Sequence, residues 1–222
     1  CVRSADGLVA LRGDYVLKLI PVGLTAGRAT QGHLFEAKGN PVVLKDADSY
    51  EEQLENEGSV IASFTARRAE IVKQLAAAAT REKLVTVTDE ALLDEVTALV
   101  ERPNVLVCKF EKELLAVQQV SRTLTKKANQ KYFPLLDGNC KLTDLFLLVS
   151  NIRPADPSLV IGGNERVVRP RLADAKFFFD QDRKKSLADR IPGLAKVVYH
   201  NKLGTQGERT QRVSAIASAF GR

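Results

Sequence analysis

The chain has 222 residues, 45% of them hydrophobic and 27% charged, so it can bury a core in one large domain or two small ones. No apolar run approaches the roughly 18 residues of a membrane span, and the first residues lack the charged-then-apolar pattern of a secretion signal. The formal net charge of +6 is concentrated near the C-terminus, because residues 162–212 hold 12 Lys and Arg against 6 Asp and Glu, whereas residues 1–161 hold 20 against 21.

Cysteine and histidine are scarce. Cys1, Cys108 and Cys140 are odd in number and far apart, and they form neither a CxxC pair nor a metal-ligand spacing. Reduced thiols in a cytoplasmic protein are the simplest interpretation. The only histidines are His33 and His200, so we expect no metal site. The chain has no Met, not even at position 1, and we expect it to be a piece of a longer polypeptide.

The first part of the chain predicts short strands. Apolar runs at residues 8–11 and 15–20 are separated by an Arg-Gly-Asp sequence, and a Gly-Asp centre is typical of a β-hairpin turn. Further extended segments are expected at residues 27–35 and 42–44, with a Gly-Asn-Pro turn between them. We expect His33 to be a packed strand residue rather than a catalytic base.

The middle of the chain alternates helices and strands. Capping residues and apolar spacing predict helices at residues 50–57, 65–80 and 117–127. A further helix, capped by Thr88 or Asp89, is expected to run through Leu99 and to end before Pro103. The expected buried side of the second helix consists of Ala69, Val72, Leu75 and Ala79. Apolar runs predict strands at residues 105–110, 131–136 and 142–149, the first as a central strand.

Residues 126–133 interleave basic and aromatic side chains. This pattern can neutralise and stack single-stranded RNA, but it can also be a polar turn that leads into a strand. We expect Phe133 to lie in the core, and we keep Lys131 as a candidate RNA contact.

A long basic helix is predicted between residues 161 and 190, after a Pro-containing loop at residues 153–157. Asn164 follows two glycines and is placed to cap the helix, or to help cradle a phosphate there. Pro170 lacks an N–H group, so the helix must either kink or begin at that residue.

Apolar residues of this helix indicate how it packs. Val168, Leu172, Ala175 and Phe179 follow the 4-3-4 spacing of a core-facing stripe, and we expect Leu172 and Phe179 to be buried. Phe177 points almost opposite to Phe179, so the helix should pack on more than one side.

A basic row lies along one flank of the stripe, because Arg169, Lys176 and Arg183 recur every seven residues. A localised positive face suggests nucleic acid or an anionic membrane, although a solvated helix face would carry similar charges. No catalytic or metal-binding residue is assigned. The candidate RNA-binding residues are Arg166, Arg169, Lys176, Arg183, Lys184 and Lys131.

The last part of the chain is expected to be helical, with a pattern at residues 194–203 and a final helix opened by Thr205. The predicted fold class is therefore α+β. A mixed-sheet domain with flanking helices should occupy residues 1–157, and an all-helical segment residues 158–222.

Several longer strings are more specific than these patterns. NERVVRPRLADAKFFFDQDRKK (residues 164–185) and LGTQGERTQRV (residues 203–213) closely resemble the β subunit of the bacterial two-subunit glycyl-tRNA synthetase. ANQKYFPL (residues 128–135) and GLTAGRATQGHLF (residues 23–35) are also similar to that family. The resemblance runs nearly end to end and covers a middle fragment of such a subunit.

The resemblance implies part of an aminoacyl-tRNA synthetase with two α and two β chains, which joins glycine to its tRNA with ATP and Mg at the α subunit. No cofactor is expected in this fragment. The implied partners are glycine tRNA, the α subunit and the remainder of the β subunit, with no membrane. Residues 1–157 would resemble an editing-type domain of the phenylalanyl-tRNA synthetase β subunit, and residues 158–222 would include the start of an HD-type helical domain.

Three functions stay open for the fragment. The first is tRNA binding through phosphate contacts of the basic helix. The second is a hydrolytic editing pocket, against which the small size of glycine and the lack of a nucleophile–base pair both argue. The third is a structural scaffold for the α subunit.

Overall fold

The structure, a computed structural model, describes residues 7–87, 89–115 and 131–221. The chain divides into two compact units, Cys1–Arg169 and Pro170–Arg222. Helices and strands together make an α+β fold, as the sequence predicts. The helix expected at residues 117–127 and the possible cap Thr88 lie outside the described residues.

The N-terminal part of the first unit consists of short paired strands. Strand β2 (Leu11–Arg12) pairs with β3 (Tyr15–Val16) in an antiparallel hairpin, which confirms the expected turn. Gly13 in that turn has a φ of +59°, which glycine adopts without a steric penalty. Strand β1 (Leu8–Val9) pairs in parallel with β4 (Ala26–Gly27), and β5 (Ala29–Thr30) pairs with β6 (Val42–Val43).

This part of the chain also contains two short helical segments. A 3-10 turn, Pro21–Gly23, precedes β4, and helix α1 (Tyr50–Asn56) comes after β6 with Ser49 at its N-cap position. Both the helix and its starting point agree with the prediction. α1 buries Leu54, which is 4% exposed.

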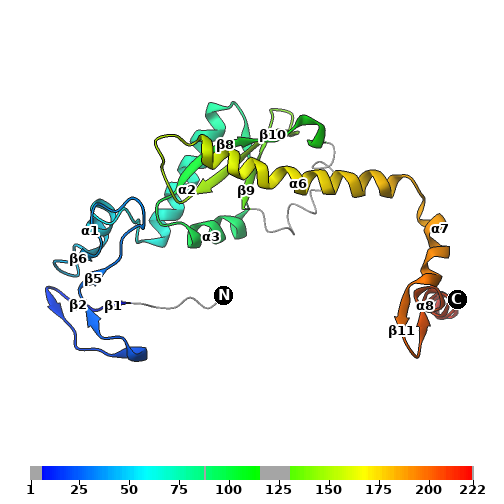
Figure 1. The fold of residues 1–222 in the computed structure, drawn as a ribbon, viewed down its shortest axis with the longest axis horizontal. Coiled ribbons are helices and arrows are strands. Elements are labelled where there is room, and N and C mark those ends of the chain that lie inside the picture. The colour runs from blue at the N-terminus through cyan, green and yellow to red at the C-terminus, as the bar shows by residue number, and fades with distance from the viewer. Residues whose placement is uncertain (1–6, 88, 116–130, 222) are drawn as a thin grey trace. The chain divides into compact units, whose positions relative to one another are not determined.

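A four-stranded antiparallel sheet forms the centre of the first unit (Figure 1). Its order is β7-β9-β10-β8, and its members are β7 (Val85–Thr86), β9 (Tyr132–Leu136), β10 (Leu142–Ser150) and β8 (Asn104–Lys109). The expectation of a central strand at residues 105–110 is wrong. Among the described strands, β8 pairs only with β10, so it lies at one end of the sheet.

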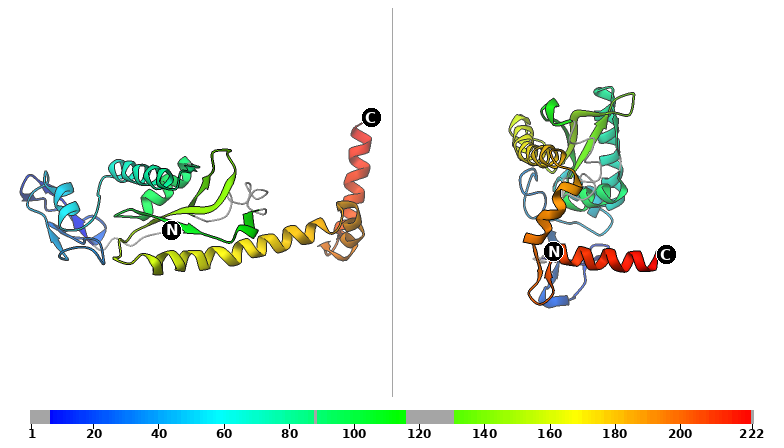
Figure 2. Two further views of the ribbon diagram at one scale, coloured as in Figure 1. Left: turned by 90° about the horizontal axis from the view of Figure 1, so that it is seen from above. Right: turned by 90° about the vertical axis from the view of Figure 1, so that its right-hand side faces the viewer.

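Helices α2 (Phe64–Arg81) and α3 (Glu90–Leu99) cover one face of this sheet (Figures 1 and 2). The core between them includes Phe133 and Leu147, both fully buried, which confirms the core position expected for Phe133. Asp89 caps α3, because its carboxylate accepts hydrogen bonds from the backbone N–H groups of Ala91 and Leu92.

The buried side of α2 differs from the predicted one. Ile71, Leu75, Ala78 and Ala79 are buried, whereas Val72 is 39% exposed and Ala69 is exposed as well. The helix is turned so that Ile71, a larger side chain than its neighbour Val72, is fully buried, and burying the larger side chain removes more apolar surface from water.

Helix α6 (Ser158–Arg183) begins six residues before the predicted cap. The Asp156 carboxylate accepts hydrogen bonds from the backbone N–H and the hydroxyl of Ser158, at 2.9 and 2.8 Å, and so satisfies the first turn. Asn164 is inside the helix, where its amide donates to the Val160 carbonyl oxygen. Pro170 also lies in the interior, so the helix does not begin there.

The N-terminal part of α6 lies against the sheet face opposite α2 and α3 (Figure 2), where Val168 is 3% exposed. A 3-10 turn, Lys112–Leu114, follows β8. The division between the two units falls at Pro170, inside α6. The sequence instead suggested a boundary in the loop at residues 153–157.

The second unit continues with α7 (Leu187–Arg190), a 3-10 segment (Ile191–Lys196), β11 (Val198–His200), β12 (Gly204–Thr205) and α8 (Gln206–Phe220). The helical pattern expected at residues 194–203 is wrong, because β11 and β12 form a small antiparallel pair. Thr205 opens α8 with a capping box that includes Glu208, as expected for a final helix.

The phenylalanine run of α6 is less buried than predicted. Leu172 and Phe179 are half-buried rather than buried, and Phe177 and Phe178 are 57% and 64% exposed. Of the α6 side chains only Val168 is buried. The expected packing on more than one side is therefore wrong for the part of the chain that the structure describes.

Candidate nucleic-acid interface

The candidate RNA-binding residues are distributed over both units. Arg166 and Arg169 lie on the part of α6 that belongs to the first unit, and Lys176 and Arg183 lie on the part that belongs to the second. Lys184 follows the last helical residue. Lys131 precedes β9, and its ammonium lies 3.7 Å from a Glu95 carboxylate oxygen of α3. The fold therefore attaches Lys131 to α3 rather than to the basic helix.

Arg169 serves the packing of α6. Its guanidinium forms an ion pair with Glu111, just after β8, and the neighbouring Glu165 carboxylate accepts a hydrogen bond from the Lys109 backbone N–H at 2.9 Å. These contacts join the first part of α6 to the end of β8. Arg169 is therefore already paired with an acid that the fold brings to it.

The other two members of the basic row have weak local contacts. Lys176 lies 2.6 Å from Asp180, four residues later, and an exposed pair of this kind contributes about 0.3–0.5 kcal/mol. The Arg183 guanidinium lies over the Phe179 ring, 5.5 Å from its centroid, and forms no ion pair with any described acid. Lys176 can therefore exchange its partner for a phosphate at little cost.

A group of exposed cations on and just after α6 has no carboxylate partner among the described residues. This group, which we call the unpaired cations, consists of Arg166, Arg171, Arg183, Lys184 and Lys185. Arg171 and Lys185 were not among the sequence candidates, although Arg171, Phe178 and Lys185 recur every seven residues just as Arg169, Lys176 and Arg183 do. A phenylalanine at the middle position interrupts this second row, so the spacing of basic residues alone does not reveal it.

The glycine pair offers no phosphate cradle at a helix start. Gly162 and Gly163 lie inside α6, so their N–H groups are not the free donors of a first turn. The true first turn follows the Asp156 carboxylate, whose negative charge disfavours an anion. The helix-terminus interpretation of Asn164 is therefore wrong.

His33 is buried, with 1% exposure, but it lies just before a turn at residues 34–36 and not in a strand. Its Nδ1 accepts hydrogen bonds from the backbone N–H groups of Phe35 and Glu36, so the ring proton is on Nε2, which donates to the Asn151 carbonyl oxygen at 2.6 Å. Both ring nitrogens are used in packing.

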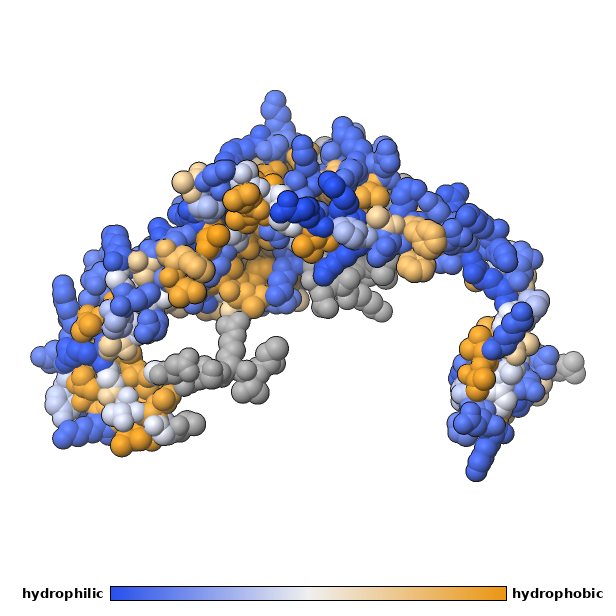
Figure 3. Space-filling view, viewed as in Figure 1, coloured by the Kyte–Doolittle hydropathy of each residue, from blue (hydrophilic) through white to orange (hydrophobic). Residues whose placement is uncertain are grey.

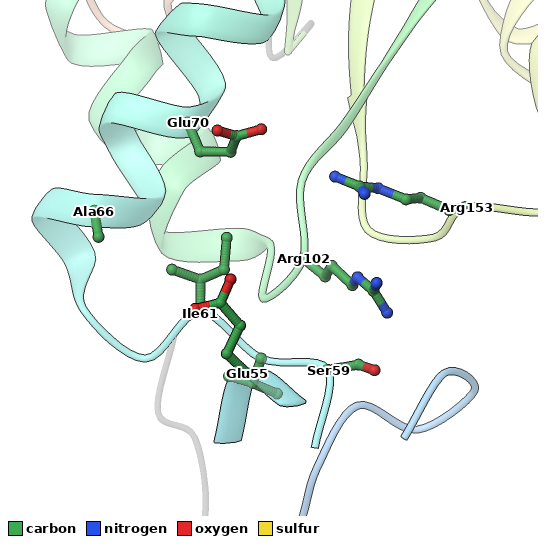
Figure 4. Close-up of a pocket in the computed structure, with 8 residues that line it drawn as sticks. Glu55, Ser59, Ile61, Ala66, Glu70, Arg102 and Arg153 are labelled. Atoms are coloured by element: carbon green, nitrogen blue, oxygen red, sulfur yellow. The ribbon is translucent and has the colours of Figure 1, made fainter. Parts of the chain in front are cut away.

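A cavity of about 340 Å³ in the first unit is the candidate for an editing-like pocket (Figure 4). Arg102 and Arg153 line it together with Glu55 of α1 and Glu70 of α2 (Figure 4), and the Arg102 guanidinium pairs with Glu36. The lining contains one hydroxyl side chain, Ser59, whose Oγ donates to the Glu36 carbonyl oxygen at 2.8 Å. The Ser59 hydroxyl is thus engaged by a backbone carbonyl, and the residues that line the cavity include no histidine or cysteine.

The described ranges contain neither a metal cluster nor a membrane-spanning helix. In residues 7–87, 89–115 and 131–221, no three His, Cys, Asp or Glu side chains gather as a metal site. No helix within these ranges has both the length and the apolar composition needed to cross a membrane.

Comparison with known proteins identifies the family. The family model for the glycyl-tRNA synthetase β subunit matches residues 1–222. The β subunit of glycine–tRNA ligase from Leptothrix cholodnii is 70% identical over 219 residues, which are 99% of this chain and 31% of that protein. The corresponding subunit from Thiobacillus denitrificans is 69% identical over 220 residues, again 99% of this chain and 31% of the relative. The chain thus spans about a third of its relatives' length, and it belongs to the glycyl-tRNA synthetase β-subunit family.

Proposed function

We propose that this chain contributes tRNA binding and subunit architecture to glycine–tRNA ligase. The ATP- and Mg-dependent joining of glycine to its tRNA would take place on the α subunit, in an assembly of two α and two β chains. The match of the whole chain to glycine–tRNA ligase β subunits carries this proposal. The free thiols of Cys108 and Cys140 agree with a place in the cytoplasm.

The unpaired cations support the tRNA contact. Exposed Lys and Arg without carboxylate partners are free to neutralise phosphates and release the counterions that these hold. Four of the five, namely Arg171, Arg183, Lys184 and Lys185, belong to the second unit. Arg171 and Arg183 are 12 residues apart, which is about 18 Å along a helix axis, so they can meet separate phosphates. Such contacts position an RNA without reading its sequence.

The salt dependence of tRNA binding tests this role. In the full-length protein that contains this chain, the triple variant Arg166→Ala, Arg183→Ala, Lys184→Ala should reduce the slope of log affinity against log salt by about 0.7–0.9 for each residue removed. The matched control is the double variant Arg169→Ala, Lys176→Ala, which removes cations that already have acidic partners. We expect a smaller change of slope per residue in the control.

Filter binding of tRNA over a range of salt concentrations gives the slopes, and circular dichroism confirms that the variants are folded. An unchanged slope in a folded triple variant would contradict phosphate contact by these residues. Equal changes per residue in the two variants would show that the ion pairs do not matter for the contact.

A scaffold role is the second candidate, favoured by the surface of the second unit. Large apolar side chains of α8, namely Val213, Ile216 and Phe220, are 57% or more exposed. Contiguous apolar surface of this kind is typical of contact with another protein element. Replacing Ile216 and Phe220 with Ser should weaken co-purification with the α subunit if that subunit covers α8.

A further inference from the structure

Two adjacent phenylalanines are exposed in the middle of a charged helix. Phe177 and Phe178 are 57% and 64% exposed, and their ring centroids are 5.5 Å apart with the planes at 75°. The rings therefore contact each other edge to face and leave ring surface open to solvent. Figure 3 shows an apolar patch on the otherwise hydrophilic surface of the C-terminal part of α6.

The cations around this aromatic pair are free. Arg171 precedes Phe178 by seven residues, so the two side chains lie on the same side of α6, about 10 Å apart along its axis. Lys184 and Lys185 follow the helix end directly, seven residues after Phe177 and Phe178. None of the three cations forms an ion pair with a described residue. The aromatic pair is thus flanked by positive charge in both directions along the chain.

The acids of residues 170–190 leave this charge in place. Asp180 pairs with Lys176, and Asp182 pairs with Arg190. Asp189 accepts a hydrogen bond from the uncharged Ser186 hydroxyl, so Asp189 and Asp174 keep their negative charge. Six Lys and Arg against four Asp in residues 170–190 still leave a net charge of +2. This excess favours an anionic occupant over a neutral one.

Charge and aromaticity together distinguish between two kinds of occupant. The centre of a protein–protein interface is depleted of charged residues, and of Lys in particular. Proteins that bind single-stranded nucleic acid instead place exposed aromatic rings beside Lys and Arg, so that bases stack while phosphates are neutralised. This combination of exposed rings and cations matches the surface formed by Phe177, Phe178, Arg171, Lys184 and Lys185.

We propose that Phe177 and Phe178 form a stacking surface for unpaired bases of RNA, with Arg171, Lys184 and Lys185 contacting the adjacent phosphates. This inference rests on the proposed tRNA-binding function and adds to it a preference for unpaired bases. A duplex keeps its bases inside the stack, so it meets only the cations. The surface accordingly favours loops or single-stranded ends.

The experiment separates stacking from apolar contact by exchanging ring for aliphatic side chains. In the full-length protein, Phe177→Leu, Phe178→Leu keeps apolar bulk but removes both rings, whereas Phe177→Tyr, Phe178→Tyr keeps the rings. The probes are a tRNA transcript, a short single-stranded RNA and a duplex of the same length. Leu187→Ala, at a residue 85% exposed in the same unit, is the control for general surface effects.

The double Leu variant should bind the single-stranded RNA between about 5-fold and about 100-fold more weakly, the range expected when one base loses its aromatic partner. Its affinity for the duplex and the salt slope for tRNA should stay unchanged, because no charge is removed. The double Tyr variant and Leu187→Ala should bind every probe as the wild type does.

One contrary result is that a folded double Leu variant binds single-stranded RNA as tightly as the wild type while the salt slope for tRNA stays steep. That result would overturn the stacking surface but not the proposed tRNA binding. Equal losses for single-stranded and duplex RNA would overturn the stacking surface as well. A wild-type protein that binds none of the three probes would overturn both this inference and the proposed tRNA binding.

Discussion

At the scale of single residues, His33 links two distant segments of the first unit. Its Nε2–H donates to the carbonyl oxygen of Asn151, 118 residues away, and its Nδ1 orders the turn that follows by accepting two backbone N–H groups. Asn151 in turn accepts hydrogen bonds through its side chain from the backbone N–H groups of Glu101 and Arg102. Buried polar groups joined in this way are costly to separate.

Replacing His33 with Ala should lower the free energy of unfolding by about 2–4 kcal/mol, because the change leaves buried backbone groups without partners and opens a cavity. Chemical denaturation measures the loss. Leu34→Ala, at a neighbouring residue 77% exposed, is the control and should change stability by less than about 0.5 kcal/mol. A similar effect of the two substitutions would contradict the linking role of His33.

Cys108 and Cys140 should differ in reactivity. Burial raises the pKa of the Cys108 thiol to about 12, with a smaller contribution from the Glu165 charge, whereas Cys140 is exposed. In a Cys1→Ser background at pH 8, a maleimide should label Cys140 rapidly and Cys108 only after unfolding. Mass spectrometry of the labelled peptides distinguishes the two sites. Rapid labelling of Cys108 in the folded protein would contradict its burial.

The same pKa difference makes stability depend on pH. The folded protein holds the Cys108 proton more tightly than the unfolded chain, in which the thiol has a pKa near 9.0. The stabilisation is therefore fully present below pH 9 and is lost as the pH rises from 9 toward 12. A Cys108→Ala variant should lose this part of the pH dependence in denaturation curves.

At the scale of elements, α2 shows how a helix chooses its buried side. Leu75 was expected in the core and is there, with 1% exposure, but Val72 is on the surface. The observed orientation of α2 also places Gln74 beside the sheet. The Gln74 side chain accepts a hydrogen bond from the Val105 N–H at 2.9 Å and donates one to the Pro103 carbonyl oxygen at 3.1 Å. Polar contacts with β8 thus contribute to the rotation of the helix.

Leu75→Ala and Val72→Ala test this orientation as a matched pair. We expect Leu75→Ala to cost about 2–5 kcal/mol, since it opens a cavity in the core. Val72→Ala should change the free energy of unfolding by less than about 1 kcal/mol, since its side chain is largely exposed. Leu75 belongs to both the predicted and the observed side, so Val72 decides the test: a cost of Val72→Ala as large as that expected for a buried side chain would make the predicted side the buried one.

At the scale of the whole molecule, the two units differ in how much they bury. The core of the first unit joins α2 and α3 to the sheet, whereas no residue of α7 or α8 is buried. Local stability follows buried apolar contact, so the units should open with different free energies. The unit with the larger core should be the more stable one.

Hydrogen exchange of the 222-residue chain measures this difference. Amides of β9 and β10 should exchange slowest, and those of α8 should exchange quickly because a helix without buried side chains opens locally at low cost. In the full-length protein, slower exchange of α8 would identify a covering partner. Protection of α8 equal to that of β10 in the 222-residue chain would contradict the expected order.

Local chemistry by itself determined a large part of this protein. Four features that depend on neighbours along the chain are confirmed: the Gly13 turn, the Asp89 cap, the core position of Phe133 and the strand at residues 142–149. The family was also recognisable from long strings such as residues 164–185, because a string of that length is specific in itself.

Only the tertiary structure decided which of several compatible local choices is realised. Strand β8 is at the end of the sheet because pairing depends on strands far along the chain. The first part of α6 contacts the end of β8 through Glu165 and the Lys109 N–H, which lie 56 residues apart in the sequence. The same reason governs the candidate interface. Whether a cation is free for phosphate depends on the acid that the fold brings to it, as Glu111 is brought to Arg169 and none to Arg166 among the described residues.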